Sequence, residues 1–234
     1  MQVVILAGGL ATRLRPITEK IPKSLIEIQG KPFLEYQINL LKADGVKDIL
    51  LCLGYLGEQI EERFGNGSKY GVNIKYIYDG KKLLGTAGAL KKANKLLQEE
   101  FFLMYGDSYL PLNYLNIMSW YKKNDKLGLM VVFKNHDQYD KSNVSVEGNL
   151  VKSYSKINKM PDMVYIDYGA SILKKDTLSF IPEDEIFPLE NLFIHLIAQR
   201  QLLAYEVTER FYEIGSVKGI DEFRRYIRGL NATG

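Results

Sequence analysis

The sequence has very few of the residues that usually hold disulfides or metal clusters. Among its 234 residues there is one cysteine, Cys52, and there are two histidines, His136 and His195. A single cysteine cannot form a disulfide within the chain, and its apolar neighbours indicate a buried core residue. Neither histidine has a second metal-binding residue at a useful spacing, so we interpret both as structural. These scarcities exclude a disulfide-stapled fold and a metal centre held by histidine or cysteine.

Long apolar runs and a strong charge of one sign are also missing. No apolar run approaches the roughly 20 residues of a membrane-spanning helix, and residues 1–6 lack the basic start of a signal peptide. The formal net charge is only +3, too little to indicate a nucleic-acid partner. The sixteen tyrosines are not interleaved with basic residues, as they would be on a single-strand nucleic-acid platform. We therefore expect a cytoplasmic protein with no nucleic-acid and no membrane partner.

Two common nucleotide-binding loops are absent as well. The chain has no G-x-x-x-x-G-K-[ST] segment, because its Gly-Lys pairs at Gly30 and Gly80 lack the upstream glycine and the hydroxyl residue. It has no G-x-G-x-x-G segment either. A P-loop and a dinucleotide-binding fingerprint are thereby excluded, and any phosphate site must be built in another way.

What the chain does contain is a regular alternation of buried strands and amphipathic helices. With 46% hydrophobic and 25% charged residues, it has the composition of one ordinary globular domain. Short β-branched and apolar runs predict strands at residues 3–6, 49–53, 74–78, 101–105 and 129–133. Apolar residues at helical spacing predict helices at residues 34–41, 60–64 and 90–97. This alternation indicates a mostly parallel α/β sheet with helices on both faces.

The pattern changes after residue 135. Closely spaced strand candidates at residues 144–146, 150–154 and 163–173 indicate an antiparallel part. A helix predicted at residues 189–198 precedes the last strands, and a final helix carries Ile220, Phe223 and Ile227 on one face. Because no linker, repeat or low-complexity segment divides the chain, we expect a single domain over residues 1–234.

Glycines and basic residues gather directly after the first predicted strand, in the segment Ala7-Gly8-Gly9-Leu10-Ala11-Thr12-Arg13-Leu14-Arg15-Pro16. Ligands of open α/β sheets bind at the carboxyl ends of strands. Glycines let the backbone approach a phosphate, and a local group of cations suits polyphosphate: Arg13, Arg15, Lys20 and Lys23. Taken alone, the segment could also be a glycine turn with surface arginines. Motifs farther along the chain favour the phosphate site.

At these residues the chain resembles the sugar nucleotidyltransferase family, also called the nucleoside-diphosphate-sugar pyrophosphorylases. Residues 8–14 match its G-G-x-G-T-R-L signature with Ala11 at the third glycine, and residues 22–23 match its P-K. Residues 85–90 match its G-T-A-x-A-L segment, which opens a helix. The resemblance implies the Rossmann-like nucleotide-diphospho-sugar transferase fold, with a nucleotide-binding part over about 1–135 and an acceptor-binding part over about 136–234. It implies that the nucleotide lies on Leu6, Ala7, Gly8, Gly9, Ala11, Thr12, Gly85 and Thr86.

Two carboxylates match the metal-binding positions of the family. Asp107 follows the strand at 101–105 in a Gly-Asp pair, and Glu213 stands in residues 211–216 where the family usually has aspartate. Mg²⁺ takes few protein ligands and fills its shell with phosphate oxygens and waters. Taken singly, Asp107 could be a helix N-cap or a turn residue, and Glu213 a surface residue. The resemblance implies Mg²⁺ as the cofactor, held by Asp107 and Glu213.

The acceptor side departs furthest from the family. Residues 166–170 align with its I-N-x-G-I segment, with Asp167 at the asparagine, and imply acceptor contacts at Asp167, Tyr168 and Gly169. The family's E-K-P is absent, and Lys156 is the candidate in that region for the lysine that binds the sugar phosphate. From the sequence alone, Asp167 could equally be a charge that protects a sheet edge.

The reaction that the resemblance implies is in-line attack of an acceptor phosphate on the α-phosphorus of a nucleoside triphosphate, with release of pyrophosphate. Arg13 would bind the leaving β- and γ-phosphates, and Lys23 the charge shared by the α-phosphate and the acceptor phosphate. The chain looks most like the heptose or mannose 1-phosphate guanylyltransferases, which implies GTP and a sugar 1-phosphate. Two alternatives stay open: a cytidylyl- or uridylyltransferase for another phosphorylated acceptor, and a non-catalytic nucleotide-sugar sensor. A homodimer is left open too.

Overall fold

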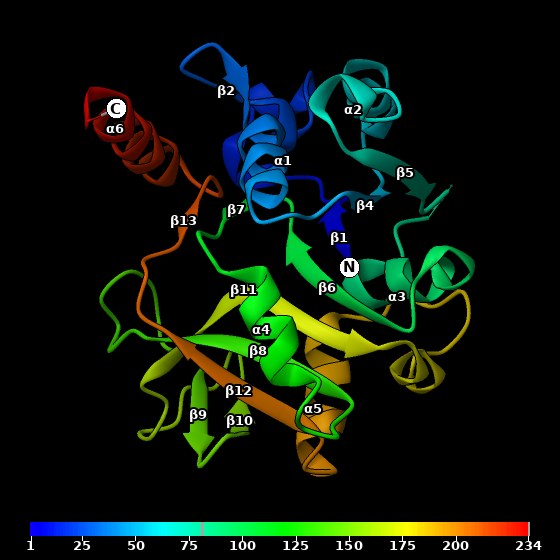
Figure 1. Cartoon of the computed structure of the whole chain (residues 1–234), viewed down its shortest axis with the longest axis vertical. Coiled ribbons are helices and arrows are strands. Elements are labelled where there is room, and N and C mark those ends of the chain that lie inside the picture. Colours follow the sequence, from blue (N-terminus) through cyan, green and yellow to red (C-terminus); the bar gives the residue numbers. More distant parts are fainter. Residues whose placement is uncertain (81, 234) are drawn as a thin grey trace.

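A nine-stranded mixed sheet forms the centre of the molecule (Figure 1). The computed structural model describes residues 1–80 and 82–233. Within this part of the chain, the strands of the sheet lie in the order β5-β4-β1-β6-β11-β8-β12-β10-β9. The first four of these strands come from the first half of the chain and the other five from the second half, so the two halves share one sheet.

The half of the sheet built from the first part of the chain is parallel, as predicted. Its strands are β1 (Gln2–Ala7), β4 (Asp48–Leu53), β5 (Asn73–Tyr78) and β6 (Glu100–Tyr105). β1 lies between β4 and β6 and pairs in parallel with both. The connecting helices are α1 (Phe33–Ala43), α2 (Gly57–Phe64) and α3 (Gly85–Lys92). α3 ends before the predicted residue 97, and a 3-10 turn at Asn94–Leu96 follows it.

The second half of the chain adds five strands: β8 (Gly128–Lys134), β9 (Val144–Glu147), β10 (Leu150–Tyr154), β11 (Tyr165–Lys174) and β12 (Leu202–Val207). β11 is antiparallel to both of its neighbours, β6 and β8, and β9 and β10 form an antiparallel hairpin. The predicted antiparallel part after residue 135 is confirmed, since β9, β10, β11 and β12 pair with one another only in antiparallel fashion. β8 was predicted among the strands of the parallel part, but it is antiparallel to β11 and parallel to β12, with Leu129 opposite Leu203. Helix α5 (Leu189–Ala198) precedes β12 and returns the chain to the end of the sheet where β8 begins.

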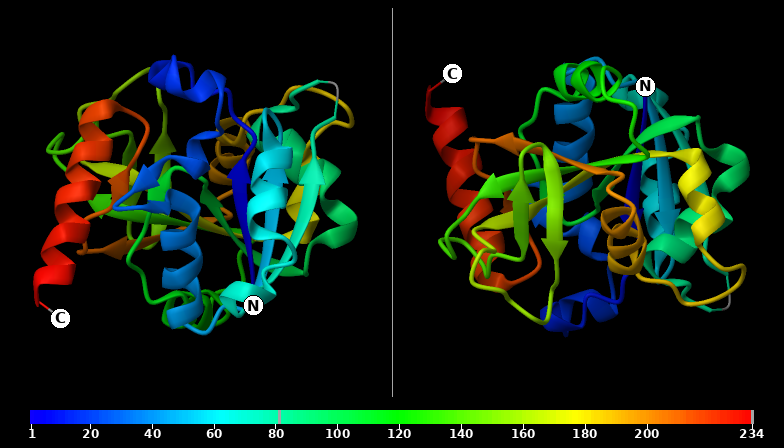
Figure 2. Two further views of the ribbon diagram at one scale, coloured as in Figure 1. Left: turned by 90° about the horizontal axis from the view of Figure 1, so that it is seen from above. Right: turned by 90° about the horizontal axis from the view of Figure 1, so that it is seen from below.

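Helices cover both faces of the sheet (Figure 2). Because successive strand residues point to opposite faces, Val3 and Ile5 belong to one core cluster and Val4 to the other. The first cluster includes apolar residues of α1, α2 and α4 (Tyr114–Tyr121), and the second those of α3 and α5. The three-layer α/β architecture is therefore confirmed, although the sequence analysis did not predict α4.

Two small sheets and the last helix lie beside the main sheet. β2 (Glu27–Ile28) pairs with β3 (Lys31–Pro32), and β7 (Ser108–Tyr109) pairs with β13 (Tyr212–Glu213). The predicted final helix is α6 (Val217–Thr233), which buries Ile220, Phe223 and Ile227 in a third core cluster. Short 3-10 helices lie at Thr12–Leu14, Ile17–Glu19, Lys23–Leu25, Ser68–Tyr70 and Lys175–Phe180.

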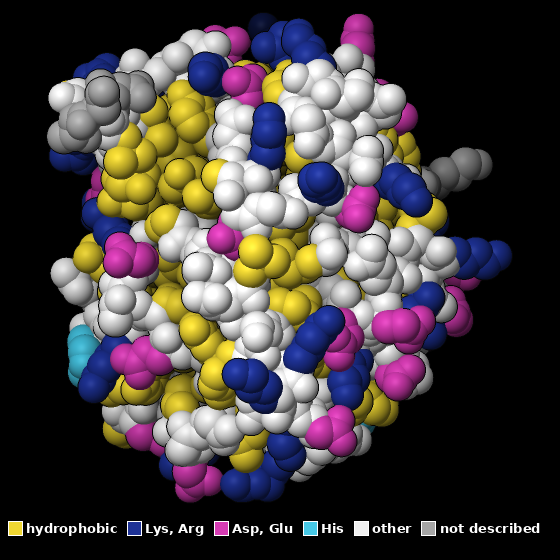
Figure 3. All heavy atoms as spheres, viewed as in Figure 1, with side chains coloured by type: hydrophobic (Ala, Val, Ile, Leu, Met, Phe, Trp, Pro, Cys, Tyr) yellow, Lys and Arg dark blue, Asp and Glu magenta, His cyan; other side chains and the backbone are white. Residues whose placement is uncertain are grey.

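The lengths of the described helices and the charges on one face of the surface bear on the predictions about membrane and nucleic-acid partners. No helix within residues 1–80 and 82–233 is long and apolar enough to cross a bilayer. On the face in Figure 3, basic and acidic side chains are intermingled. On this face, the intermingled charges agree with the small net charge and form no basic stripe.

Candidate active site

A cavity of about 260 Å³ lies where β1, β4 and β6 end. It is lined by residues from these strand ends, from the 3-10 helix at Lys23–Leu25, from the loop before α3 and from α3 itself: Leu6, Ala7, Gly8, Gly9, Lys23, Ser24, Cys52, Asp79, Leu83, Gly85, Thr86, Ala89, Tyr105, Gly106 and Asp107. Parallel strands bring their carboxyl ends to one edge of the sheet, where α/β proteins bind their ligands. Six of the eight residues predicted to bind the nucleotide lie together here, whereas Ala11 and Thr12 do not line this cavity.

Glycine is required on the floor of this cavity because two backbones approach each other closely. A Cβ atom on Gly8 would lie 3.0 Å from the amide nitrogen of Gly54, and one on Gly54 would lie 2.6 Å from the Gly8 carbonyl oxygen. By contrast, a Cβ on Gly9 would have no described heavy atom within 4 Å. Gly8 therefore serves the packing of the loop after β1 against the end of β4, while Gly9 leaves open space at the cavity.

Ala11 takes the backbone conformation that glycine usually takes. Its φ and ψ are 47° and 43°, in the left-handed region, which costs an L-residue roughly 1–2 kcal/mol. The turn is held by two bonds to the Ala11 carbonyl oxygen, one from the Leu14 amide at 3.0 Å and one from the Thr18 hydroxyl at 2.9 Å. The alanine at the third glycine of the motif therefore keeps the positive φ and carries its strain.

The start of α3 closes one side of the same cavity. Gly85 has a φ of +74°, and a Cβ there would lie 3.1 Å from the carbonyl oxygen of Phe187. The Thr86 hydroxyl accepts a 2.7 Å hydrogen bond from the amide of Leu189, the first residue of α5. These contacts attach the start of α3 to the second half of the chain, so both halves shape the cavity.

Two ionisable residues line this cavity although the sequence analysis did not place them in the nucleotide site. Asp79, just after β5, has its pKa raised by burial, although the Leu84 amide donates a 3.3 Å hydrogen bond to its Oδ2 and Lys92 lowers the pKa. Cys52 is buried, as predicted, and burial raises the pKa of its thiol to about 12, so it stays protonated. Asp79 has no motif around it, and only its place on the cavity wall reveals it.

Lys23 and the two predicted metal ligands come together beside this cavity. Lys23 Nζ lies 2.7 Å from Asp107 Oδ2, across 84 residues of sequence. β13 pairs with β7 so that Glu213 stands opposite Ser108, and the Ile214 amide donates to the Asp107 carbonyl oxygen at 2.9 Å. A Cβ on Gly215 would lie 3.7 Å from Asp107 Oδ2 and 3.9 Å from Glu213 Oε1, so both carboxylates border the same small space.

The pKa of Glu213 depends on the charged groups that surround it. Glu213 is exposed, yet desolvation by the groups packed around it raises its pKa; the negative charges of Asp107 and Asp140 raise the pKa further, and Arg13 and Lys23 lower it. No group of three acidic, histidine or cysteine side chains that could hold a metal forms among the described residues. A pair of carboxylates still fits Mg²⁺, which commonly uses one or two of them together with substrate phosphates and water. Asp107 lies in a turn and is not a helix N-cap.

A second cavity, of about 440 Å³, adjoins the first. It is lined mostly by polar residues: Arg13, Tyr105, Asp107, Ser108, Asp140, Lys141, Ser142, Asn143, Ser155, Lys156, Ile157, Lys159, Ile166, Asp167, Tyr168, Gly169, Phe211 and Glu213. All four residues predicted to bind the acceptor lie here together, and so does Arg13, which was predicted to bind the nucleotide phosphates. The two cavities share Tyr105 and Asp107, which therefore form the wall between them.

Asp167 lies in the middle of the sheet, and its reading as a charge that protects a sheet edge is wrong. It belongs to β11, an interior strand of the sheet, where it lies opposite Val132 of β8 and its backbone amide donates to the Asn143 side chain. Tyr154 donates a hydrogen bond to its Oδ2 at 3.2 Å, and the Gly169 amide donates to its Oδ1 at 3.0 Å. Burial nevertheless raises its pKa, while the positive charge of Lys156 lowers it. The paired strands and these bonds hold the carboxylate in one orientation toward the second cavity.

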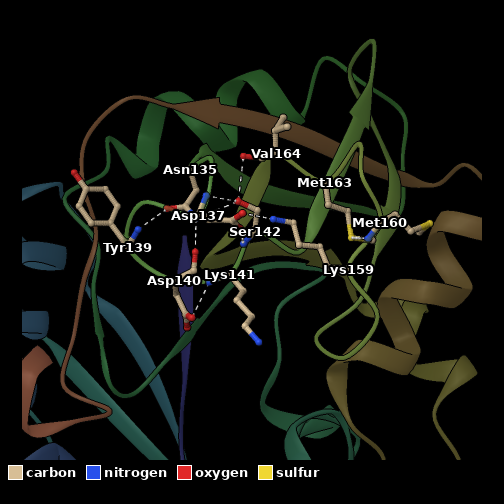
Figure 4. Close-up of polar contacts among 10 residues, drawn as sticks. All are labelled: Asn135, Asp137, Tyr139, Asp140, Lys141, Ser142, Lys159, Met160, Met163 and Val164. Atoms are coloured by element: carbon tan, nitrogen blue, oxygen red, sulfur yellow. Dashed lines mark hydrogen bonds and ion pairs between the residues drawn. The ribbon is translucent and has the colours of Figure 1, made fainter.

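Tyr168 and the loop before β9 complete the walls of the second cavity. The ring of Tyr168 is 1% exposed and packs on Phe211 with ring centroids 5.5 Å apart, so its bulk belongs to the core. In the loop, Ser142 and Asp137 bond each other, and Lys159 from the facing segment forms an ion pair with Asp137 (Figure 4). These contacts order the loop that carries Asp140 and Asn143. The amide carbonyl of Asn143 in turn accepts from the Asp167 amide at 2.9 Å.

Both histidines lie outside these two cavities. His195 is exposed on α5 and packs on Phe180, with ring centroids 4.2 Å apart. His136 has a φ of 46° in the loop before β9 and is exposed. Among the described residues, neither belongs to a group of three or more side chains that could hold a metal ion.

Comparison with known proteins now identifies the family. The family model described as nucleotidyl transferase matches residues 2–143, which is more than half of the chain. The chain belongs to the nucleotidyl transferase family. It is 32% identical over 217 residues to D-glycero-alpha-D-manno-heptose 1-phosphate guanylyltransferase of Campylobacter jejuni, covering 92% of this chain and 95% of that protein.

Other nucleotidyl transferases share the sequence and the fold. The catalytic subunit beta of mannose-1-phosphate guanylyltransferase of Danio rerio is 30% identical over 230 residues, covering 93% of this chain. The chain spans 62% of that longer relative. The crystal structure of HddC from Yersinia pseudotuberculosis superimposes with a TM-score of 0.81 at 25% identity, covering 97% of this chain and 99% of that one. A putative glucose-1-phosphate thymidylyltransferase from Bacillus anthracis superimposes with a TM-score of 0.87 at 18% identity, covering 97% of this chain and 95% of that one. These matches confirm the nucleotide-diphospho-sugar transferase fold over both halves of the chain.

Proposed function

We propose that this chain joins a nucleoside triphosphate to a sugar 1-phosphate and releases pyrophosphate. The observation that carries the proposal is the shared wall of the two cavities, where Tyr105 and Asp107 face both and Lys23 is bonded to Asp107. A glycine-floored cavity suits the nucleotide and the polar one a sugar. Transfer between two phosphates requires them to meet beside positive charge, and Lys23 lies at that meeting point.

The chemistry needs positioning and charge more than a protein nucleophile. An oxygen of the acceptor phosphate attacks the α-phosphorus, the bond from the α-phosphorus to the bridging oxygen breaks, and pyrophosphate leaves with that electron pair. Lys23 is the group for the charge shared by the two reacting phosphates. Arg13 lines the second cavity near Glu213, where it would stabilise the leaving phosphates. The acceptor is already an anion, so no general base is required.

Magnesium is part of the proposal because the carboxylates of Asp107 and Glu213 border one space. When bound there, the ion would supply positive charge to the phosphate oxygens. Lys23 forms an ion pair with Asp107, and desolvation together with the negative charges of Asp107 and Asp140 raises the pKa of Glu213, so a cation beside the two carboxylates would be favourable.

For the nucleotide we propose GTP, on the strength of Asp79. Guanine presents two adjacent donors, N1–H and the 2-amino group, and an ionised carboxylate accepts both, whereas uracil offers one donor between two acceptors. Asp79 lines the first cavity, and its Oδ1 has no hydrogen-bond partner within the described part of the chain. The two guanylyltransferase relatives named above support the same base. Cytosine likewise has no two adjacent donors, because its 4-amino group stands beside the acceptor N3, so the chemistry of Asp79 favours GTP over the uridylyl and cytidylyl alternatives.

The test is a pyrophosphate-release screen of GTP, UTP, CTP and ATP against mannose 1-phosphate, a heptose 1-phosphate, glucose 1-phosphate and phosphocholine, each with Mg²⁺ and with excess chelator. We expect release with GTP and a sugar 1-phosphate, abolished by chelation. Inosine triphosphate, which lacks the 2-amino group, should be a poorer substrate than GTP. Binding of nucleotide without release in every pair would support the sensor alternative and refute the enzyme.

The cellular location and the assembly stay predictions. A cytoplasmic location remains part of the proposal because a phosphorylated sugar and a nucleoside triphosphate are both cytoplasmic metabolites. Sedimentation of the purified chain would decide whether it forms a homodimer.

A further inference from the structure

Tyr105 occupies a place that the family motifs do not explain. It is the last residue of β6 and lines both cavities, directly before Gly106 and Asp107. A Cβ on Gly169 would lie 3.5 Å from Cδ2 of its ring, so the chain on the acceptor side passes close to the ring. The ammonium of Lys156 lies over the ring, 5.3 Å from its centroid. Tyr105 therefore connects the wall of the two cavities to the candidate phosphate-binding lysine.

Lys156 is bound by residues of other elements, through its backbone by Glu190 of α5 and through its side chain by Tyr105 of β6. It follows β10 in a stretch that is neither strand nor helix, and its neighbour Ile157 is 86% exposed. Its backbone amide donates a 3.0 Å hydrogen bond to Oε1 of Glu190 on α5. Its ammonium makes no hydrogen bond and no ion pair with any residue that the structure describes, although Asp167 acts on it through space. An ammonium with no hydrogen-bond acceptor, at the wall of a polar cavity, is available to bind an anionic group of a ligand.

The contact with Lys156 uses the face of the Tyr105 ring, since the ammonium lies over it. A neutral ring offers the negative face that attracts a cation, and this attraction strengthens where water is excluded. The Lys156 ammonium therefore lies against a residue of the wall that the two cavities share.

We propose that Tyr105 and Glu190 are positioning residues that present the Lys156 ammonium to the phosphate of the acceptor. Glu190 fixes the backbone of Lys156 and Tyr105 fixes the direction of its side chain. The inference rests on the proposed function and deepens it, because it states how this chain orients a lysine without the local E-K-P segment. Neither residue acts on the nucleotide chemistry directly.

The kinetic test compares variants that remove each contact with variants that keep it. Tyr105→Leu and Glu190→Ala should each raise the KM for the sugar 1-phosphate by about tenfold, with a small change in kcat, since a partly desolvated cation–π contact or hydrogen bond commonly has this worth. Tyr105→Phe keeps the ring face and Glu190→Gln keeps an acceptor oxygen, so both should stay within about twofold of wild type. Tyr205→Leu, on β12 outside both cavities, is the matched control for loss of a partly buried tyrosine.

A double-mutant cycle with Lys156→Met distinguishes positioning from a merely structural role. If Tyr105 acts through Lys156, adding Tyr105→Leu to Lys156→Met should raise the acceptor KM by less than about twofold more. Fully additive effects would overturn the proposal, as would a Tyr105→Phe variant that loses as much as Tyr105→Leu. Glu190→Ala, at a half-buried side chain near the start of α5, provides a second cycle if Tyr105→Leu does not fold.

A readout without turnover separates this proposal from the proposed function. In protein with ¹³C-labelled lysine, the ring current of Tyr105 should shift the Lys156 methylene signals upfield, and mannose 1-phosphate or inorganic phosphate should move them. The shift should survive in Tyr105→Phe and vanish in Tyr105→Leu. Signals that respond to phosphate in a protein that releases no pyrophosphate would sink the enzyme and keep the positioning role. An unshifted Lys156 that ignores both phosphates would overturn the positioning role, even with active enzyme.

Discussion

Replacement of Lys23 by methionine is the perturbation that separates catalysis from stability most clearly. The change removes the ammonium but keeps a side chain of similar length, and it leaves Asp107 without the partner that lies 2.7 Å away. Both side chains are about one quarter exposed, so the pair is partly screened and its loss should cost only about 1 kcal/mol of unfolding free energy. In a chain of this length that corresponds to a melting temperature about 2–4 °C lower. The reacting phosphates lose much more, because a charge placed at a water-poor reaction centre commonly contributes about 3 kcal/mol, or roughly 100-fold in turnover.

The assay is pyrophosphate release with GTP and a sugar 1-phosphate, run beside thermal unfolding of the same preparations. Lys91→Met is the matched control, because Lys91 forms a 3.1 Å ion pair with Glu183, is 16% exposed and lines neither cavity. We expect both variants to melt at similar temperatures and only Lys23→Met to lose turnover. If Lys23→Met keeps its turnover within about threefold while its melting temperature falls like that of the control, Lys23 is only the structural partner of Asp107 and the reasoning fails.

Three further predictions follow from single residues of the site. Asp79→Asn should raise the KM for GTP and remove the preference for GTP over inosine triphosphate. Burial raises the pKa of Asp79, which means that the folded state favours the protonated carboxyl. The stability that protonation of Asp79 contributes is therefore fully present below the ordinary pKa of 3.8 and is lost as pH rises through the raised pKa. The ligand-free asparagine variant should therefore melt above wild type at pH 7 and no higher at pH 3; a lower melting temperature at pH 7 would contradict this sign. Ala11→Gly should relieve the left-handed strain and stabilise the chain by about 1 kcal/mol, and a lower melting temperature would show that the turn is not strained. Glu213→Gln should raise the Mg²⁺ concentration needed for half-maximal turnover while changing unfolding by no more than about 0.5 kcal/mol, and an unchanged Mg²⁺ titration would return Glu213 to a surface role.

The parallel half of the fold could be predicted from the sequence because its signal is local. Buried strands such as β1 are continuous apolar runs, and the helices between them repeat apolar residues at helical spacing. The parallel pairing of β12 with β8 could not be predicted in this way, since the direction of a strand depends on where α5 returns the chain. Helix α4 was missed because aromatic and β-branched residues in its eight positions, such as Tyr114 and Trp120, do not separate helix from strand.

The sequence by itself determined the chemistry that is available: a glycine loop after the first strand, Lys23 in the segment that follows, a Gly-Asp pair after β6 and an acidic residue near the end of the chain. Only the tertiary structure decided which of these groups meet. Lys23 contacts Asp107, which lies 84 residues later in the sequence. Glu213 is brought beside Asp107 by the pairing of β13 with β7, and Lys156, which follows β10, lies over the ring of Tyr105 at the end of β6. Asp79 and Glu190 joined the site without any motif. The reason is physical: local periodicity specifies strands and helices, but contacts between distant residues depend on strand register and on where each connection re-enters the sheet.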